Sequence, residues 1–235
     1  MAFPSRCAAL SAGMMVAAGL GWLSFSGSPA VSAQAPDAAS AAPKAPVAAA
    51  AAPSTAPPSG EYTQGAMQVA DLLASLNKLD SDGKPIPQKM GFEIPEQAIN
   101  EYLAYSLRNK PRPGIASVTV SLLPKNELTA TVEIDFNSVT QWNPEILPEP
   151  LRTLLSGRRT MKVNAHFESG NGTFTFTLKD AHGPDGKPLD NQLMMTLLQA
   201  IGEHQPESYN AGKPISLPFG LKRVWTGKQS VMGET

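Results

Sequence analysis

The clearest pattern along the chain is a strict alternation of apolar and polar residues. It occurs in four short segments, which are 117–122, 128–136, 161–168 and 173–179. Such alternation is typical of strands with one buried face and one solvated face. Lys125-Asn126 separates the first two segments, and Gly170-Asn171-Gly172 separates the last two. Because Asn and Gly accept the positive φ of tight turns, each pair is predicted to form an antiparallel hairpin.

Apolar residues recur at helical spacing in four other segments. We expect helices over 66–79, from Pro95 to about 107, over 150–156 and over 190–204. Pro95 suits a first helical turn, and Asp190 suits an N-cap. A last strand is predicted over 217–225.

These elements, taken in order, predict the fold class. The order is two helices, a hairpin, a helix, a second hairpin, a helix and a last strand, and hairpin strands pair antiparallel. We therefore predict an α+β fold. Its curved antiparallel sheet has about five strands, with helices packed on the apolar face of the sheet.

Charge is spread unevenly and divides the chain into three parts. Of 19 Lys+Arg and 20 Asp+Glu in 235 residues, the first 60 residues carry only Arg6, Asp37 and Lys44. The uncharged apolar stretch 7–25 is followed by Val31-Ser32-Ala33, which fits the small-residue rule for signal cleavage. We predict a signal peptide over 1–33, with a retained membrane anchor at 7–25 as the alternative. Either form implies a periplasmic or secreted location.

Residues 34–60 contain 12 Ala and 6 Pro, and the prolines break any helix that the alanines would favour. Too few apolar side chains are present to form a core, so we predict a disordered Ala/Pro-rich linker. The sequence leaves two interpretations of this segment open. It is either a spacer that holds the domain away from a membrane or partner, or a disordered leader. The single folded α+β domain is expected over 61–235.

Composition and motifs exclude several functional classes. The net charge of −1 lacks the surplus of Lys and Arg that nucleic-acid binding needs. The one cysteine, Cys7, allows no disulfide framework, and no phosphate-binding glycine loop or serine-hydrolase motif is present. We expect no enzymatic activity and no cofactor. A metal site formed by Asp180, His182 and Asp185 is the enzymatic alternative, although their Gly-Pro-Asp-Gly surroundings indicate a turn.

Two basic clusters lie where helices are expected to end, and cations are favoured there by the helix dipole. Contact with a phosphate headgroup or an anionic partner is the functional alternative. The candidates for such contact are Arg108, Arg112, Arg158 and Arg159.

One stretch carries a family resemblance. Residues 92–103, Phe-Glu-Ile-Pro-Glu-Gln-Ala-Ile-Asn-Glu-Tyr-Leu, resemble a helix opening of extracytoplasmic proteins related to the tubular lipid-binding (TULIP) superfamily. The paired strands, Asp185-Gly186-Lys187-Pro188-Leu189 and Leu217-Pro218-Phe219-Gly220-Leu221 follow in the same order, so the resemblance covers roughly 92–225. It implies a curved antiparallel sheet around one long helix, with an apolar groove for acyl chains. This chain departs from the longest forms in its short, proline-broken helices.

The apolar faces of strands and helices have two interpretations, a closed core or a lipid-sized groove. The candidate groove residues are Ile99, Leu103, Leu107, Val118, Val120, Val132, Ile134, Phe136, Phe167, Phe174, Phe176, Met194 and Leu198. We predict an extracytoplasmic binding domain for lipid or another apolar ligand. The alternative is an adaptor domain of an envelope assembly with a protein partner. The oligomeric state does not follow from the residues.

Overall fold

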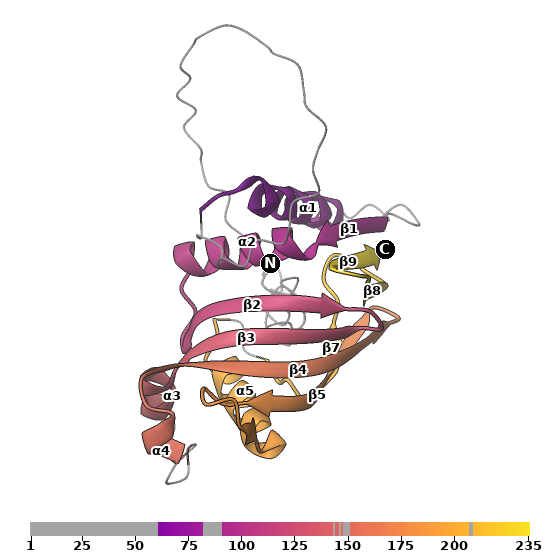
Figure 1. Cartoon of the computed structure of the whole chain (residues 1–235). Coiled ribbons are helices and arrows are strands. Elements are labelled where there is room, and N and C mark those ends of the chain that lie inside the picture. The colour runs from indigo at the N-terminus through magenta and orange to yellow at the C-terminus, as the bar shows by residue number, and fades with distance from the viewer. Residues whose placement is uncertain (1–60, 82–90, 143, 146, 148–150, 207–208) are drawn as a thin grey trace, which may run out of the picture.

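The computed structural model describes residues 61–81, 91–142, 144–145, 147, 151–206 and 209–235 (Figure 1). The predicted signal peptide and linker lie outside these residues. In the described part, no helix combines the length and the hydropathy needed to cross a bilayer. In chain order the elements are α1 (Gln64–Ser81), β1 (Gly91–Pro95), α2 (Glu96–Asn109), β2 (Ile115–Leu123), β3 (Glu127–Asp135), α3 (Phe136–Trp142), α4 (Leu151–Leu154), β4 (Arg158–Gly170), β5 (Thr173–His182), β6 (Pro188–Leu189), α5 (Asn191–Glu203), β7 (Ile215–Ser216), β8 (Arg223–Thr226) and β9 (Ser230–Glu234).

The larger sheet is antiparallel and has six strands in the order β2-β3-β4-β5-β6, with β7 paired to the start of β5. Both predicted hairpins are confirmed, because β2 pairs with β3 and β4 pairs with β5. Their turns contain the expected positive φ, at 60° for Asn126, 52° for Asn171 and 75° for Gly172. Local turn chemistry thus selects the pairing at the centre of the sheet.

A second sheet, in the order β1-β9-β8, was not predicted. The predicted strand over 217–225 is wrong for most of its length, since β8 begins only at Arg223. Phe219 and Gly220 have φ of 56° and 65°, and the Leu221 N–H donates to the Pro218 carbonyl, so a turn stands where the strand was expected. The α+β class is confirmed, and the number of strands was underestimated.

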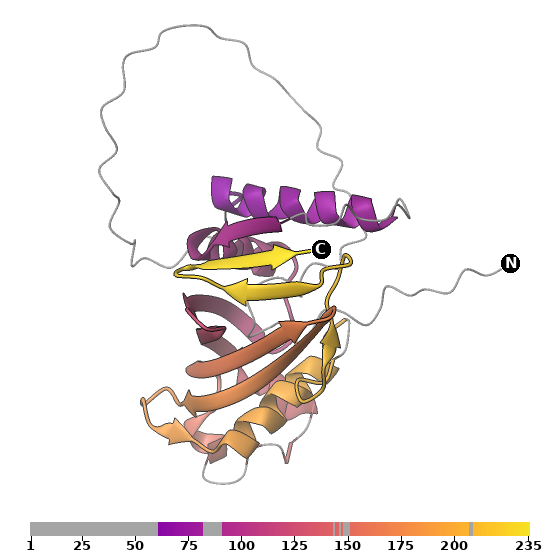
Figure 2. The ribbon, with the colours of Figure 1, turned by 90° about the vertical axis from the view of Figure 1, so that its right-hand side faces the viewer.

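Helices α5 and α2 contact the larger sheet in different ways. One face carries α5, which lies behind the strands in Figure 1 and crosses them obliquely in Figure 2. The Asp190 side chain caps α5 as predicted, accepting a hydrogen bond of 2.9 Å from Leu193 N. In contrast, α2 runs along the edge of β2 and does not cover the apolar face. The expectation that the helices pack on that face therefore holds for α5 but not for α2.

Side-chain hydrogen bonds join α2 to the edge of β2. Asn100 Nδ2 donates to the Val120 carbonyl, and Asn100 Oδ1 accepts from Val120 N, both at 2.8 Å. Glu96 accepts from Leu122 N at 2.6 Å. These bonds take the place of a neighbouring strand and cover groups that an exposed edge would leave open to another chain.

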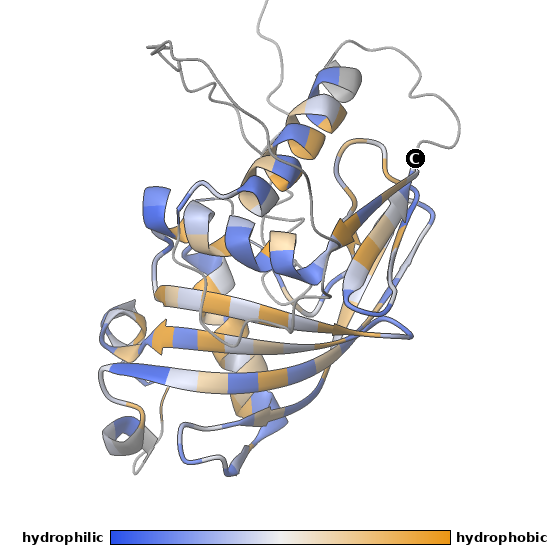
Figure 3. Cartoon of the chain, turned by 45° about the horizontal axis from the view of Figure 1, so that its top comes forward, coloured by the Kyte–Doolittle hydropathy of each residue, from blue (hydrophilic) through white to orange (hydrophobic). Residues whose placement is uncertain are grey.

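A second set of polar contacts joins the smaller sheet to the hairpin ends of the larger one. Thr226 Oγ1 accepts from Asn126 N, and Thr226 N donates to Asn126 Oδ1. Ser169 bonds both the N–H and the carbonyl of Val224. The alternating hydropathy of the long strands is visible in Figure 3. Buried apolar side chains from α1 to β9 form one continuous cluster, so both sheets share a core.

Candidate functional site

The apolar candidates from the sequence are all buried. Each of the thirteen predicted groove residues has at most 7% of its surface exposed, and all belong to the common core. Phe136 was expected to end a strand but instead begins α3, where it is fully buried. Most of these side chains therefore pack against other protein atoms and leave little room for a ligand.

One gap in this packing lies between α5 and the strands β2 and β3. It is lined only by aliphatic side chains and Met, namely Ile115, Val118, Val132, Ile134, Met194, Leu198 and Ile201. Its volume is about 10 Å³, which at this measure is about the room that one water molecule needs. The sequence identified five of these residues as groove candidates, but Ile115 and Ile201 were missed.

Gln205 lies near the segments that border this gap, just after α5. Its Nε2 donates to the carbonyl of Pro113 at 3.1 Å and to that of Ile201 at 2.9 Å. Gln205 is 6% exposed, and among the described residues its Oε1 has no hydrogen-bond partner. An acceptor that is buried without a partner costs about 1–3 kcal/mol. This atom is therefore a polar group that a ligand or a water molecule would stabilise.

Two further contacts hold the end of α5. The His204 ring stacks on Trp142 of α3, with centroids 4.4 Å apart and an angle of 7° between the planes. The Tyr209 ring packs against Gly202 so closely that a Cβ there would lie 2.7 Å from it. Burial raises the pKa of Tyr209 above its usual range. The C-terminal end of α5 is thus fixed by stacking, packing and hydrogen bonds together.

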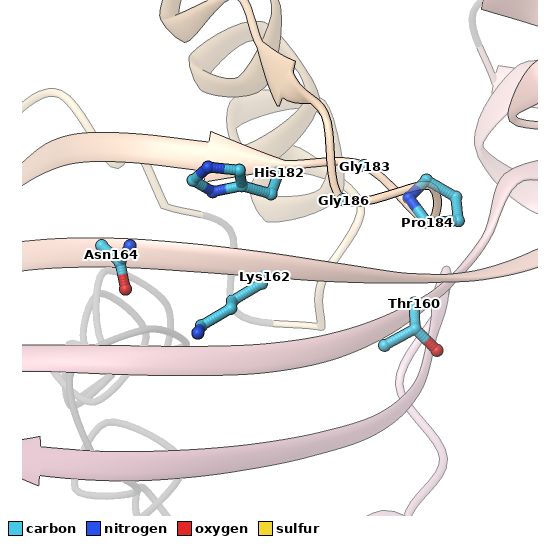
Figure 4. Close-up of a pocket in the computed structure, with 7 residues that line it drawn as sticks. All are labelled: Thr160, Lys162, Asn164, His182, Gly183, Pro184 and Gly186. Atoms are coloured by element: carbon cyan, nitrogen blue, oxygen red, sulfur yellow. The ribbon is translucent and has the colours of Figure 1, made fainter.

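The opposite face of the larger sheet is polar and contains a hollow of about 380 Å³ (Figure 4). It is lined by side chains of β4 and the end of β5, and by the turn that follows: Thr160, Lys162, Asn164, His182, Gly183, Pro184 and Gly186. Lys162 and His182 are direct partners in the register of β4 and β5. The alternation that predicted the strands also predicted that this row faces solvent.

A chain of polar contacts crosses three strands beside the hollow. Thr129 donates to Asn164 Oδ1 at 2.7 Å, and Asn164 Nδ2 donates to Asp180 Oδ1 at 2.6 Å. His182 Nδ1 lies 3.3 Å from the same Asp180 oxygen, at an angle that forms no hydrogen bond. The arrangement can hold a small polar group, with the Lys162 ammonium and the His182 ring at its sides.

Of the three residues considered as metal ligands, Asp180, His182 and Asp185, the last is engaged by Lys187. Asp185 accepts from Lys187 N at 3.1 Å and pairs with Lys187 Nζ at 3.2 Å. The Lys187 N–H holds the pKa of Asp185 below its usual value. Among the described residues, no three His, Cys, Asp or Glu side chains come together as metal ligands.

Three of the basic candidates, Arg112, Arg158 and Arg159, lie toward the same end of the larger sheet. Arg112 forms a bridge with Ile115 at the start of β2, and Ile115, Ile134 and Arg159 are successive partners across β2, β3 and β4. Arg158 stands next in the row, opposite Asp135. Arg108 is exposed in the last turn of α2. Neighbouring strands lie about 4.8 Å apart, so the backbones at Ile115 and Arg159 are about 10 Å apart at this end of the sheet.

Comparison of the chain with protein-family models, curated proteins and solved structures finds no match. The resemblance to tubular lipid-binding proteins therefore stays a prediction. The contact of Gln205 with the Pro113 carbonyl was missed because the two residues lie 92 positions apart in the chain. No periodicity or motif signals a contact of that kind.

Proposed function

We propose that this protein is a non-enzymatic extracytoplasmic binding domain for a slender apolar ligand, such as an acyl chain. The observation that carries the proposal is the gap between α5 and strands β2 and β3. Its lining offers no polar side chain, and it lies where a helix crosses a sheet. Apolar pockets between packed elements are common ligand sites. The signal-like segment 1–33 supports the extracytoplasmic location.

Binding requires α5 to move away from β2 and β3, because a gap of about 10 Å³ is smaller than an alkyl chain. The side chains of α5 that line the gap are Met194, Leu198 and Ile201. Exposing each to water costs about 1.5–3 kcal/mol. An alkyl chain that replaces the lost contacts offsets this cost, whereas a polar ligand does not. The proposed site is therefore selective for apolar ligands.

Fluorescence of N-phenyl-1-naphthylamine, an apolar probe, tests the proposal on the purified full chain. We expect a saturable rise in fluorescence with the wild type. Leu198→Trp places a larger ring in the gap and is expected to weaken binding at least tenfold. Gln199→Trp is the matched control, since Gln199 is the next residue and is exposed. Circular dichroism checks whether both variants are folded.

Native mass spectrometry of protein purified from envelope fractions gives a second test. Repeated recovery of a bound lipid mass would support the proposal. Protein that is always recovered empty, together with equal probe binding by Leu198→Trp and Gln199→Trp, would overturn it.

The second candidate function is an adaptor domain of an envelope assembly. The observation in its favour is the burial of all thirteen groove candidates, which is the state of a closed core. In that case the Ala/Pro-rich segment 34–60 would hold the domain away from the membrane. Cross-linking in intact envelopes separates the two functions. A single stable protein partner, recovered with ligand-free protein, would favour the adaptor.

A further inference from the structure

The hollow on the polar face of the larger sheet takes no part in the proposed apolar site. It lies on the face opposite α5, and its volume of about 380 Å³ is in the range of small-molecule sites. Figure 4 shows Thr160, Lys162 and Asn164 spaced along β4, with His182 beside them on β5 and Pro184 in the turn beyond. Two strands and a turn thus place these five residues around one space.

The charge of this lining is positive. Among the described residues that line the hollow, Lys162 carries the only permanent charge, and none is an Asp or a Glu. Lys162 is exposed, and within the described ranges it forms no ion pair. Its ammonium group is therefore available to a negatively charged ligand.

The carboxylates nearby have other partners. Asp180 accepts from Asn164 Nδ2 at 2.6 Å and lies 3.3 Å from His182 Nδ1. Glu133, which pairs with β4 from the neighbouring strand β3, accepts from Ser117 Oγ at 3.3 Å. Neither Asp180 nor Glu133 lines the hollow. These contacts leave the lysine as the charge that a ligand in the hollow meets.

The other polar side chains of the lining add hydrogen-bond donors. The Thr160 hydroxyl forms no hydrogen bond within the described part of the chain. The Asn164 amide has two N–H groups, of which one is used by Asp180. The His182 ring contributes an N–H in either of its neutral forms. Lys162 and His182 are direct partners in the register of β4 and β5, so their side chains lie side by side.

We propose that this hollow binds a phosphate group, with Lys162 Nζ as its main contact and Thr160 and His182 as additional donors. A tetrahedral anion accepts hydrogen bonds from several directions, as these donors offer them. A planar carboxylate is matched best by the fork of an arginine, which this lining lacks. The phosphate belongs to a soluble small molecule or to a lipid headgroup, which share this chemistry. The inference is independent of the proposed function, because the apolar gap lies on the other face of the sheet.

NMR titration of the ¹⁵N-labelled full chain with inorganic phosphate, at neutral pH and constant ionic strength, tests the proposal. We expect saturable shifts of the backbone amide resonances of Lys162 and His182. The expected dissociation constant is about 1 mM, which two charge-assisted hydrogen bonds support. Acetate should bind about tenfold more weakly or less than that.

Variants of exposed lysines separate a site from general attraction. Lys162→Gln removes the charge and keeps most of the side-chain length, and it should weaken phosphate binding about tenfold or more, the range of one charge-assisted hydrogen bond. Lys213→Gln is the matched control, since it removes the same charge from an exposed residue outside the lining. It should bind as the wild type does. Lys162→Arg restores the charge and should keep most of the affinity. Circular dichroism checks the fold of each variant.

Two further probes distinguish the sources of the phosphate. For a soluble ligand, sn-glycerol 3-phosphate should shift the same resonances, and vesicles should bind no protein. For a lipid headgroup, phosphatidylcholine vesicles that contain phosphatidic acid should sediment the wild type but not Lys162→Gln, and vesicles of phosphatidylcholine alone should sediment neither.

Three results would overturn the inference. They are equal phosphate affinity in Lys162→Gln and Lys213→Gln, equal affinity of the wild type for phosphate and acetate, and shifts that do not saturate or that spread over the surface away from the hollow. None of them bears on binding of an apolar probe between α5 and the sheet, so each proposal can fail alone.

Discussion

Asn100 makes two of the side-chain hydrogen bonds that join α2 to the edge of β2, and replacing it gives a quantitative test of the fold. Asn100 both donates to and accepts from the backbone of Val120, which is fully buried. The change Asn100→Leu keeps a side chain of similar size and removes both hydrogen bonds. It leaves one N–H and one carbonyl of the edge strand without a protein partner.

The expected loss follows from these two bonds. Each contributes about 0.5–1.5 kcal/mol net, and a buried group left unsatisfied costs about 1–3 kcal/mol. Asn100 is only partly buried, so water reaches the edge and repairs part of the deficit. We expect Asn100→Leu to lower the free energy of unfolding by about 2–3 kcal/mol.

Urea unfolding followed by circular dichroism measures this loss. Asn109→Leu is the control, because Asn109 lies on the same helix and makes one exposed bond to the Tyr105 carbonyl. We expect a loss of about 0.5 kcal/mol or less there. Hydrogen exchange of the Val120 amide gives a local signal, and its protection should fall in Asn100→Leu only.

One pair of results would refute the reasoning. A loss for Asn100→Leu no larger than that of Asn109→Leu, with Val120 exchanging as slowly as in the wild type, would mean that the edge is held without Asn100. Size-exclusion chromatography adds a second readout. An exposed edge strand is expected to promote association between chains, so the variant should elute earlier at high concentration.

Two further predictions concern buried contacts. Gly202→Ala places a Cβ 2.7 Å from the Tyr209 ring and should lower the free energy of unfolding, measured in urea, by about 1–3 kcal/mol. The control is Gly170→Ala, where a Cβ meets nothing within 4 Å and the loss should be under about 1 kcal/mol. Equal losses in the two variants would contradict the clash with Tyr209. Burial raises the pKa of Tyr102 to about 12 from 10.0, so its neutral form is favoured in the fold. Tyr102 therefore contributes on the order of 3 kcal/mol to the free energy of unfolding. This contribution is complete below pH 10 and is lost as the pH rises through 12. Between pH 9 and pH 11.5, the urea midpoint should fall less for Tyr102→Phe than for the wild type. An equal fall in the two proteins would refute this prediction.

Local chemistry was sufficient for the centre of the larger sheet. Alternation in 117–122 and 161–168 set which side chains face inward, and the Asn171-Gly172 turn joined neighbouring strands. The Asp190 cap was likewise readable, because it depends on residues three positions apart. Such features need only neighbours in the chain, so their signal is contained in a short window of sequence.

The smaller sheet was missed because its strands are too short to show alternation. β9 is Ser-Val-Met-Gly-Glu, and its partner β1 lies more than 130 positions earlier. Thr226 and Asn126 are 100 positions apart, and neither residue type predicts the other. These strands gain most of their stability from pairing and from the shared core, which tertiary contacts alone supply.

The candidate site, too, was predictable from the sequence only in part. Periodicity established that Val118, Val132, Met194 and Leu198 face inward, and that a polar row faces out. It could not establish whether the inward faces close on each other, because a period reports the direction of a side chain and not the distance to the next layer. Tertiary structure decided that distance, leaving a gap of about 10 Å³ between α5 and strands β2 and β3.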